Sequence, residues 1–121
     1  MKDPLLIEQR YGLSEASSQR VAFHWPLHPL YNYVRHPERY HPPVGGESFD
    51  DLYRRAEQFI RESLKPLEGQ YDAVLVSAHG AILCALQGCM FDVPVSDFWT
   101  MILPNCGIRT ILMDQGVFTR Q

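Results

Sequence analysis

The hydrophobic positions of this chain first follow a helical period and then become continuous. Between residues 49 and 64, apolar side chains recur at helical spacing and form one face. Ser48 can cap this segment, Asp50 and Asp51 suit the positive end of a helix dipole, and Pro66 ends it. The pattern predicts an amphipathic helix after Ser48. The charged residues that lie mostly off its apolar face are Arg54, Arg55, Glu57, Arg61 and Glu62.

The next apolar segment does not alternate. Residues 71–77 contain four consecutive apolar side chains, which is typical of a parallel strand covered on both faces. Residues 80–90 follow as a helix, and residues 107–113 read as a second strand. A turn at 114–116 would return residues 117–119 as an edge strand. The expected core stripe of the helix is Ile82, Leu83, Leu86 and Met90.

The first 46 residues have a different composition, which is rich in proline, histidine and aromatic residues. We expect a short helix over 14–25, a helical turn at 31–35 and a loop at 41–46 bounded by Pro-Pro and Gly-Gly. A further short capped helix is expected at 96–99. No repeat or linker divides the chain. We therefore expect one domain over 1–121, in which an irregular, lid-like region (1–46) precedes a helix-strand-helix-strand core (47–121).

Composition excludes several classes of protein. The 121 residues carry a net charge of −3, and no basic stripe marks a nucleic-acid binder. No apolar run is long enough to span a bilayer and no signal peptide opens the chain, so we expect a cytoplasmic protein without a membrane partner. The three cysteines, Cys84, Cys89 and Cys106, lack paired spacing and read as free thiols. His24 and His28 are four apart, but Pro26 between them argues against a helical metal site.

Two local motifs carry candidate chemistry. His79 and Gly80 stand where the predicted strand meets a helix, and a histidine beside free helix N–H groups can hold a phosphate. A histidine that only hydrogen-bonds locally is the alternative. Glu47 follows the pair Gly45-Gly46 at a helix start. It either complements the helix dipole, worth about 0.3–1 kcal/mol, or points into a pocket that the glycines let a ligand approach.

Together these motifs resemble the histidine phosphatase superfamily, also called phosphoglycerate mutase-like. The resemblance runs from about Asp3 to Thr110. It rests on four motifs in order. They are Leu5 with Glu8 and Gly12-Leu13; Gly45-Gly46-Glu47-Ser48-Phe49 followed by Arg55; Val74-Leu75-Val76-Ser77-Ala78-His79-Gly80-Ala81-Ile82; and Pro104-Asn105-Cys106-Gly107-Ile108.

The resemblance implies an α/β fold, a phosphoglycerate mutase-like sandwich with a mostly parallel sheet flanked by helices. It implies hydrolysis of a phosphate monoester of a small molecule through a phosphohistidine, with no metal and no cofactor. Glu47 would be the general acid and later the base that activates water. His79 would be the second histidine, which stabilises the phosphoryl group. The backbone N–H of Gly80 would add to the phosphate site.

One departure from the family matters most. The family's attacking histidine lies in an Arg-His-Gly motif, and the only Arg-His pair here, Arg35-His36, precedes Pro37. The nucleophile is therefore expected to be missing, and the fold incomplete because its first strand is absent. The chain would be a truncated product, half of a split enzyme, or a non-catalytic phospholigand-binding or oligomerising module. In each case it is expected to be inactive alone.

An incomplete sheet would expose an apolar strand edge. We therefore expect either a homo-oligomer or association with a missing N-terminal half. The aromatic residues of the expected lid, 21–43, favour a phosphatase over a mutase, although they are equally compatible with packing.

Overall fold

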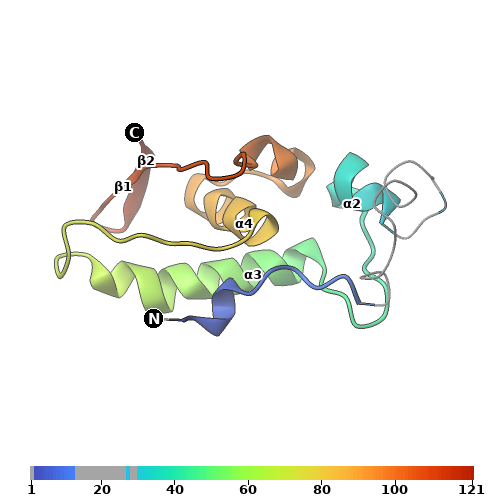
Figure 1. Cartoon of the computed structure of the whole chain (residues 1–121), viewed down its shortest axis with the longest axis horizontal. Helices are drawn as coiled ribbons and strands as arrows, with labels where there is room; N and C mark the ends of the chain where they lie inside the picture. Colours follow the sequence, from blue (N-terminus) through green and yellow to red (C-terminus); the bar gives the residue numbers. More distant parts are fainter. Residues whose placement is uncertain (1, 13–26, 28–29) are drawn as a thin grey trace.

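A computed structural model describes residues 2–12, 27 and 30–121; the helix expected at 14–25 lies outside these residues, as do His24 and His28. Two helices, α3 (Phe49–Phe59) and α4 (Gly80–Phe91), pack on each other through the middle of the molecule (Figure 1). The 3₁₀ segment η6 (Val95–Met101) packs on the other side of α4. A two-stranded hairpin lies at one end of the molecule, and α2 (Tyr31–Arg35) lies at the other.

Helix α3 begins where the sequence predicts. The Ser48 side chain accepts a hydrogen bond from the backbone N–H of Asp51 at 3.1 Å, which caps the first turn. The helix continues as a π-helical turn, η4 (Ile60–Leu64), and ends in the 3₁₀ turn η5 (Lys65–Leu67), which contains Pro66. The predicted apolar face is confirmed. Its buried members are Phe49, Leu52, Ala56, Phe59, Ile60 and Leu64.

Helix α4 is a core helix, as expected. Ile82 and Leu86 of its predicted stripe are buried, whereas Leu83 and Met90 are half-buried. At Gly88 the helix backbone lies close to a side chain of α3, where an added Cβ would overlap the hydroxyl of Tyr53. Only a residue without a side chain lets the Tyr53 ring lie against the α4 backbone.

An aromatic cluster joins the N-terminal region to this helical core. The ring centroid of Tyr33, on α2, lies 5.1–5.4 Å from those of Tyr11, Tyr40, Phe49 and Trp99. The indole N–H of Trp99 donates to the carbonyl of Tyr33 at 2.7 Å. Tyr33 and Tyr40 are buried, so these two aromatic residues of the expected lid pack within the core.

The expectation of a buried strand at 71–77 is wrong. The segment is extended, but its backbone forms no sheet ladder within the described chain. Val76 and Ala78 pack against the core, while Leu75 on the opposite side is 84% exposed. A strand is buried on both faces only when two layers enclose it and neighbouring strands pair with its edges. Here the helices cover one face, and no described strand lies beside it.

The observed sheet is a hairpin. Strand β1 (Ile111–Asp114) pairs antiparallel with β2 (Val117–Arg120), and Ile111 lies opposite Arg120. The turn and the returning strand are confirmed, but the strand expected from Gly107 begins only at Ile111. The fold thus mixes helices with a small sheet, and the predicted parallel sheet does not form among the described residues.

Three short helical elements complete the fold: η1 (Pro4–Leu6), η3 (Pro37–Arg39) and η6. Element η6 replaces the short capped helix expected at 96–99 and has no side-chain cap. None of the described helices is by itself long and apolar enough to cross a membrane. Helix α4 and η6 together pass that test by length and composition only, and they are bent by 115°.

The N-terminal segment is fixed against the loop before α3. The N–H of Glu47 donates to the carbonyl of Arg10 at 2.8 Å, and Tyr11 forms an isolated antiparallel bridge with Gly46. Gly12 has φ +60° and packs so closely on residues 44–46 that a Cβ would overlap their backbone. This contact brings the residues that precede Gly12 between the starts of α3 and α4.

Candidate functional site

His79 and Gly80 stand at the start of α4, as the sequence predicts. His79 is the residue that precedes the helix; it is exposed and its ring makes no hydrogen bond with the described residues. The backbone N–H of Gly80 is likewise without a partner in that part of the chain. Both groups are therefore available to an anion at the positive end of the α4 dipole.

A carboxylate from the N-terminal segment lies at the same place. The side chain of Glu8 accepts hydrogen bonds from the backbone N–H groups of Ala81 and Ile82, each at 3.0 Å. The Gln9 N–H donates to the same carboxylate at 3.0 Å. Negative charge at a helix N-terminus is typically worth 0.3–1 kcal/mol, up to about 2 kcal/mol when partly buried. Glu8 therefore caps the N-terminus of α4, whereas the His79 side chain forms no capping hydrogen bond.

Sequence reasoning named Glu8 only as part of a motif and gave it no role. The sequence gives only a weak indication that Glu8 binds the start of α4. His79 cannot cap α4 as a serine or aspartate would, so the helix needs an acceptor from elsewhere. The acceptor comes from 73 residues earlier in the chain, and only the tertiary structure identifies it.

Glu47, the predicted general acid, is buried with 4% of its surface exposed. The guanidinium of Arg55 holds both of its oxygens, Nη2 to Oε1 at 2.8 Å and Nε to Oε2 at 3.0 Å. This is the bidentate geometry in which an arginine binds a carboxylate most tightly. Arg55, which the sequence places with the charged residues mostly off the apolar face, contacts the N-terminal segment, and 17% of its side chain is exposed.

Arg55 also binds the backbone around Glu8. Its Nη1 donates to the carbonyls of Leu5, at 2.8 Å, and of Ile7. The side-chain amide of Gln9 donates to the Glu47 carbonyl at 2.9 Å. The structure therefore brings Glu8 together with His79 and Gly80. It connects Glu47 to them through the N-terminal segment, and no contact with either is found in the described residues.

The charge of Glu8 acts on two other titratable groups. Burial raises the pKa of the Tyr33 hydroxyl, and the nearby Tyr11 and the charge of Glu8 raise it further. Burial also raises the pKa of Cys84 to about 12, with a smaller contribution from Glu8. Glu8 therefore lies near a phenol on α2 and a thiol on α4. An imidazole and a free N–H at one helix start can bind an oxyanion.

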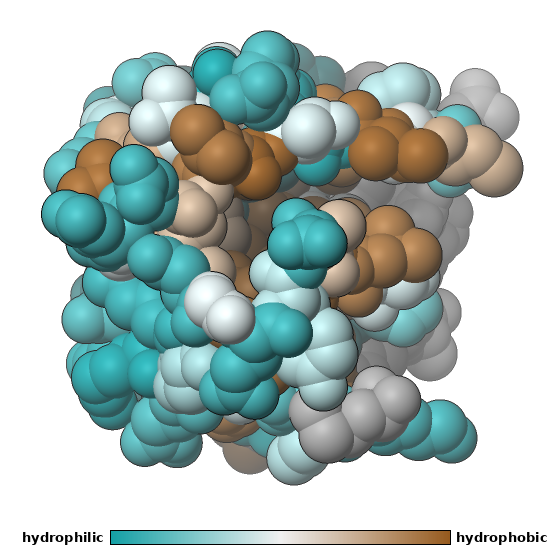
Figure 2. Space-filling model, turned by 90° about the vertical axis from the view of Figure 1, so that its left-hand side faces the viewer, coloured by the Kyte–Doolittle hydropathy of each residue, from teal (hydrophilic) through white to brown (hydrophobic). Residues whose placement is uncertain are grey.

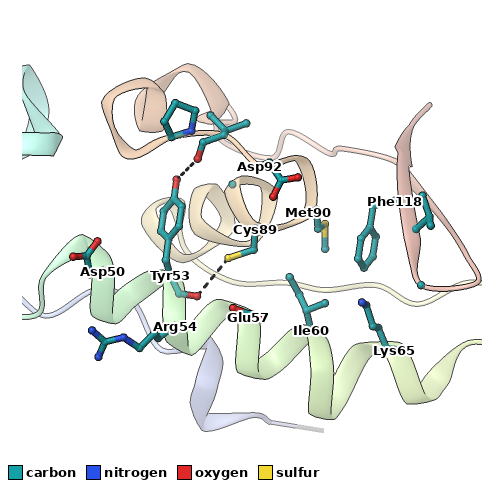
Figure 3. Close-up of a pocket in the computed structure, with 15 residues that line it drawn as sticks. Asp50, Tyr53, Arg54, Glu57, Ile60, Lys65, Cys89, Met90, Asp92 and Phe118 are labelled. Atoms are coloured by element: carbon teal, nitrogen blue, oxygen red, sulfur yellow. Dashed lines mark hydrogen bonds between the residues drawn. The ribbon is translucent and has the colours of Figure 1, made fainter.

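A groove lies elsewhere in the described part of the molecule. It has a volume of 780 Å³ and is bounded by α3, the C-terminal half of α4 and the hairpin (Figure 3). Two contacts fix its wall: the Tyr53 hydroxyl donates to the Val93 carbonyl at 3.1 Å, and the Cys89 thiol to the Tyr53 carbonyl at 3.4 Å. From the end where the hairpin lies, apolar groups are seen around a hollow (Figure 2). His79, Gly80 and Glu8 are not among the residues that line the groove.

Across the part of the chain that the structure describes, no group of three histidine, cysteine or acidic side chains is arranged to hold a metal ion. Cys84 is buried, Cys89 half-buried and Cys106 exposed, and all three are free thiols.

Comparison with solved structures identifies the fold. The chain superposes on YhfR of Bacillus stearothermophilus with a TM-score of 0.83 at 24% identity, covering 98% of this chain and 58% of that one. It superposes on the alpha-ribazole phosphatase of Shigella flexneri with a TM-score of 0.78 at 21% identity, covering 98% and 57% respectively. The chain thus spans less than two thirds of the length of either protein. No curated protein matches its sequence.

Sequence comparison supplies the family. The profile of the "Histidine phosphatase superfamily (branch 1)" matches residues 1–120, nearly the whole chain. Both solved structures agree with it in fold, and the match includes the start of α4 and the Glu8 segment. The chain therefore belongs to the histidine phosphatase superfamily, branch 1.

Proposed function

We propose that this chain supplies the proton-transfer and phosphoryl-stabilising part of a site that hydrolyses a phosphate monoester of a small molecule. The observation that carries the proposal is the start of α4, where the His79 ring is exposed and the Gly80 N–H has no partner among the described residues. Family membership supplies the reaction class. The remaining assignments are our own inference from this geometry.

His79 serves as the second histidine, which binds phosphoryl oxygens together with the N–H of Gly80. A phosphoryl transition state is stabilised mainly by positioning and by charge, and both groups lie at the positive end of α4. A bound phosphate would favour the charged imidazolium, which strengthens the contact.

Two carboxylates compete for the role of general acid. Glu47, assigned by resemblance, is held on both oxygens by Arg55, so it would have to break that ion pair to hand over a proton. Glu8 also accepts hydrogen bonds on both oxygens, from the N–H groups of Gln9 and Ile82 on Oε1 and from that of Ala81 on Oε2. The contacts therefore do not favour Glu8 over Glu47 as proton donor, and we keep Glu47, which the resemblance assigns, as the proposed general acid, while Glu8 holds the start of α4.

The chain alone is proposed to be inactive, because no described histidine other than His79 lies at this site to attack phosphorus. Of the others, His36 pairs with Glu38 and His41 stands in the loop before α3. The nucleophile would come from a second polypeptide segment. That segment would pair with residues 73–78, whose backbone forms no sheet ladder among the described residues. Three free thiols support a cytoplasmic setting.

Phosphate binding tests the site directly. Titration of the chain with inorganic phosphate, followed by ³¹P NMR, should show binding that His79→Ala abolishes. His36→Ala, at a half-exposed loop histidine, is the matched control and should bind as the wild type does. Equal binding by the wild type and the His79 variant would refute the site.

Hydrolysis is tested separately. The purified chain should not turn over an aryl phosphate at mildly acid pH. Substantial turnover that His79→Ala abolishes would show that the nucleophile is already present in the chain.

A non-catalytic oligomerising module is the second candidate, favoured by the exposed apolar side chains Leu75 and Ile108 next to unpaired backbone. It predicts a dimer by light scattering that Leu75→Lys dissociates. Val44→Lys, at an equally exposed position in the loop before α3, should leave the dimer intact. A monomeric wild type would refute this candidate.

A further inference from the structure

Glu8 is fixed from both sides of its own backbone. On the N-terminal side, the carbonyls of Leu5 and Ile7 accept hydrogen bonds from Arg55. On the C-terminal side, Gln9 donates its side-chain amide to the Glu47 carbonyl, and Arg10 accepts from the Glu47 N–H. Every one of these contacts ends on Arg55 or Glu47.

These two residues are themselves locked together. Arg55 uses Nε and Nη2 for the Glu47 carboxylate, which leaves Nη1 free for the two backbone carbonyls. The planar guanidinium makes this arrangement possible, because its donors point in fixed directions from one rigid group. A lysine would keep the charge but could not serve four acceptors on two segments.

Charge also favours this arrangement. Glu47 is buried beside the segment that carries Glu8, and an isolated buried carboxylate is unfavourable. Arg55 neutralises the buried Glu47. Glu8 instead accepts hydrogen bonds from the helix N–H groups of Ala81 and Ile82.

We propose that Arg55 is a positioning residue for Glu8: together with Glu47 it fixes residues 5–10 so that the Glu8 carboxylate meets the first N–H groups of α4. The functional meaning of the clamp rests on the proposed function, since Glu8 holds the helix start that is proposed to bind phosphate. Its physical content does not depend on phosphate binding or on turnover.

The backbone amide protons of Ala81 and Ile82 report the position of Glu8. Hydrogen bonds to a carboxylate are short and strongly polarised, so both amides should resonate downfield in a ¹⁵N-labelled sample of the full chain. Glu8→Ala defines the positions of these signals without the contact. Arg55→Lys should move both signals at least halfway towards those positions.

Arg54→Lys is the matched control. It changes the neighbouring arginine on the same helix, which is exposed and pairs with Asp51 at 3.1 Å. It should leave both amide signals where they are in the wild type. In Glu8→Ala/Arg55→Lys the signals should coincide with those of Glu8→Ala alone, because there is then no carboxylate left to position.

If Arg55→Lys does not fold, Glu47→Gln provides the milder change, because the amide oxygen still accepts one guanidinium N–H while the second becomes unpaired. Unshifted Ala81 and Ile82 signals in either folded variant would overturn the clamp and reduce Arg55 to a source of stability. Since no phosphate is present, that failure is distinct from a failure of phosphate binding at His79.

Discussion

The carboxylate of Glu47 is held on both oxygens by the guanidinium of Arg55, at 2.8 and 3.0 Å, with only 4% of the glutamate exposed. The two residues lie eight apart, one just before α3 and the other in its second turn. A glutamate that the sequence presents as a catalytic candidate is thus half of a buried ion pair. The pair joins α3 to the N-terminal segment.

Glu47→Ala should destabilise the chain by about 3 kcal/mol, since removing one partner leaves a charge that is largely shielded from water. Urea unfolding followed by circular dichroism measures the loss. Arg54→Ala removes the exposed partner of Asp51 and should cost no more than roughly 0.5 kcal/mol. Equal losses in the two variants would show that the buried pair adds nothing beyond a surface pair.

Glu8→Gln should tighten the binding of inorganic phosphate at the start of α4. The wild-type carboxylate repels an incoming dianion, and its neutral isostere removes a repulsion of about 1 kcal/mol, or roughly fivefold in affinity. Isothermal titration at neutral pH and low salt measures the change. Glu57→Gln, on the exposed side of α3, should bind as the wild type does. Weaker binding by the Glu8 variant would mean that phosphate does not approach this carboxylate.

Gly88→Ala should destabilise the packing of α3 on α4 by roughly 1–3 kcal/mol, because the new methyl group overlaps the Tyr53 ring. Tyr53→Ala removes the obstacle. The double variant should therefore lose less than the sum of the two single losses, as thermal or urea unfolding can show. Additive losses would indicate that the helices shift apart without strain.

The three thiols should differ in their rate of reaction with a thiol reagent. Burial raises the pKa of Cys84 to about 12 and that of Cys89 to about 11, so at pH 8 both are almost entirely protonated and poorly nucleophilic. Cys106 is exposed. A thiol reagent at pH 8 should modify one cysteine quickly in the native chain and all three in denaturant. Cys106→Ser should remove the fast phase; a fast phase that persists in that variant would contradict the assignment.

Local sequence patterns accounted for the helices. Ser48 with the acidic residues after it defined the start of α3, and the apolar stripe of residues 49–64 matched the buried face. The start of α4 at Gly80 was also foreseen. These features depend on capping and helical periodicity, which act over a few residues and are therefore readable from the chain alone.

The burial of the predicted strand could not be inferred from local sequence patterns. The apolar run at 73–76 indicates a strand enclosed by two layers, but enclosure and edge pairing come from other segments. In the structure Leu75 lies in solvent and the ladder is missing within the described residues.

The sequence by itself determined the family, the positions of α3 and α4, and the place of His79 at a helix start. Only the tertiary structure decided which carboxylate stands there. Glu8 and Ala81 are 73 residues apart, and no local pattern links them. Glu47 has a suitable sequence context, but the hydrogen-bonding geometry of Arg55 commits both of its oxygens. The partners that bind each carboxylate are brought together only by folding.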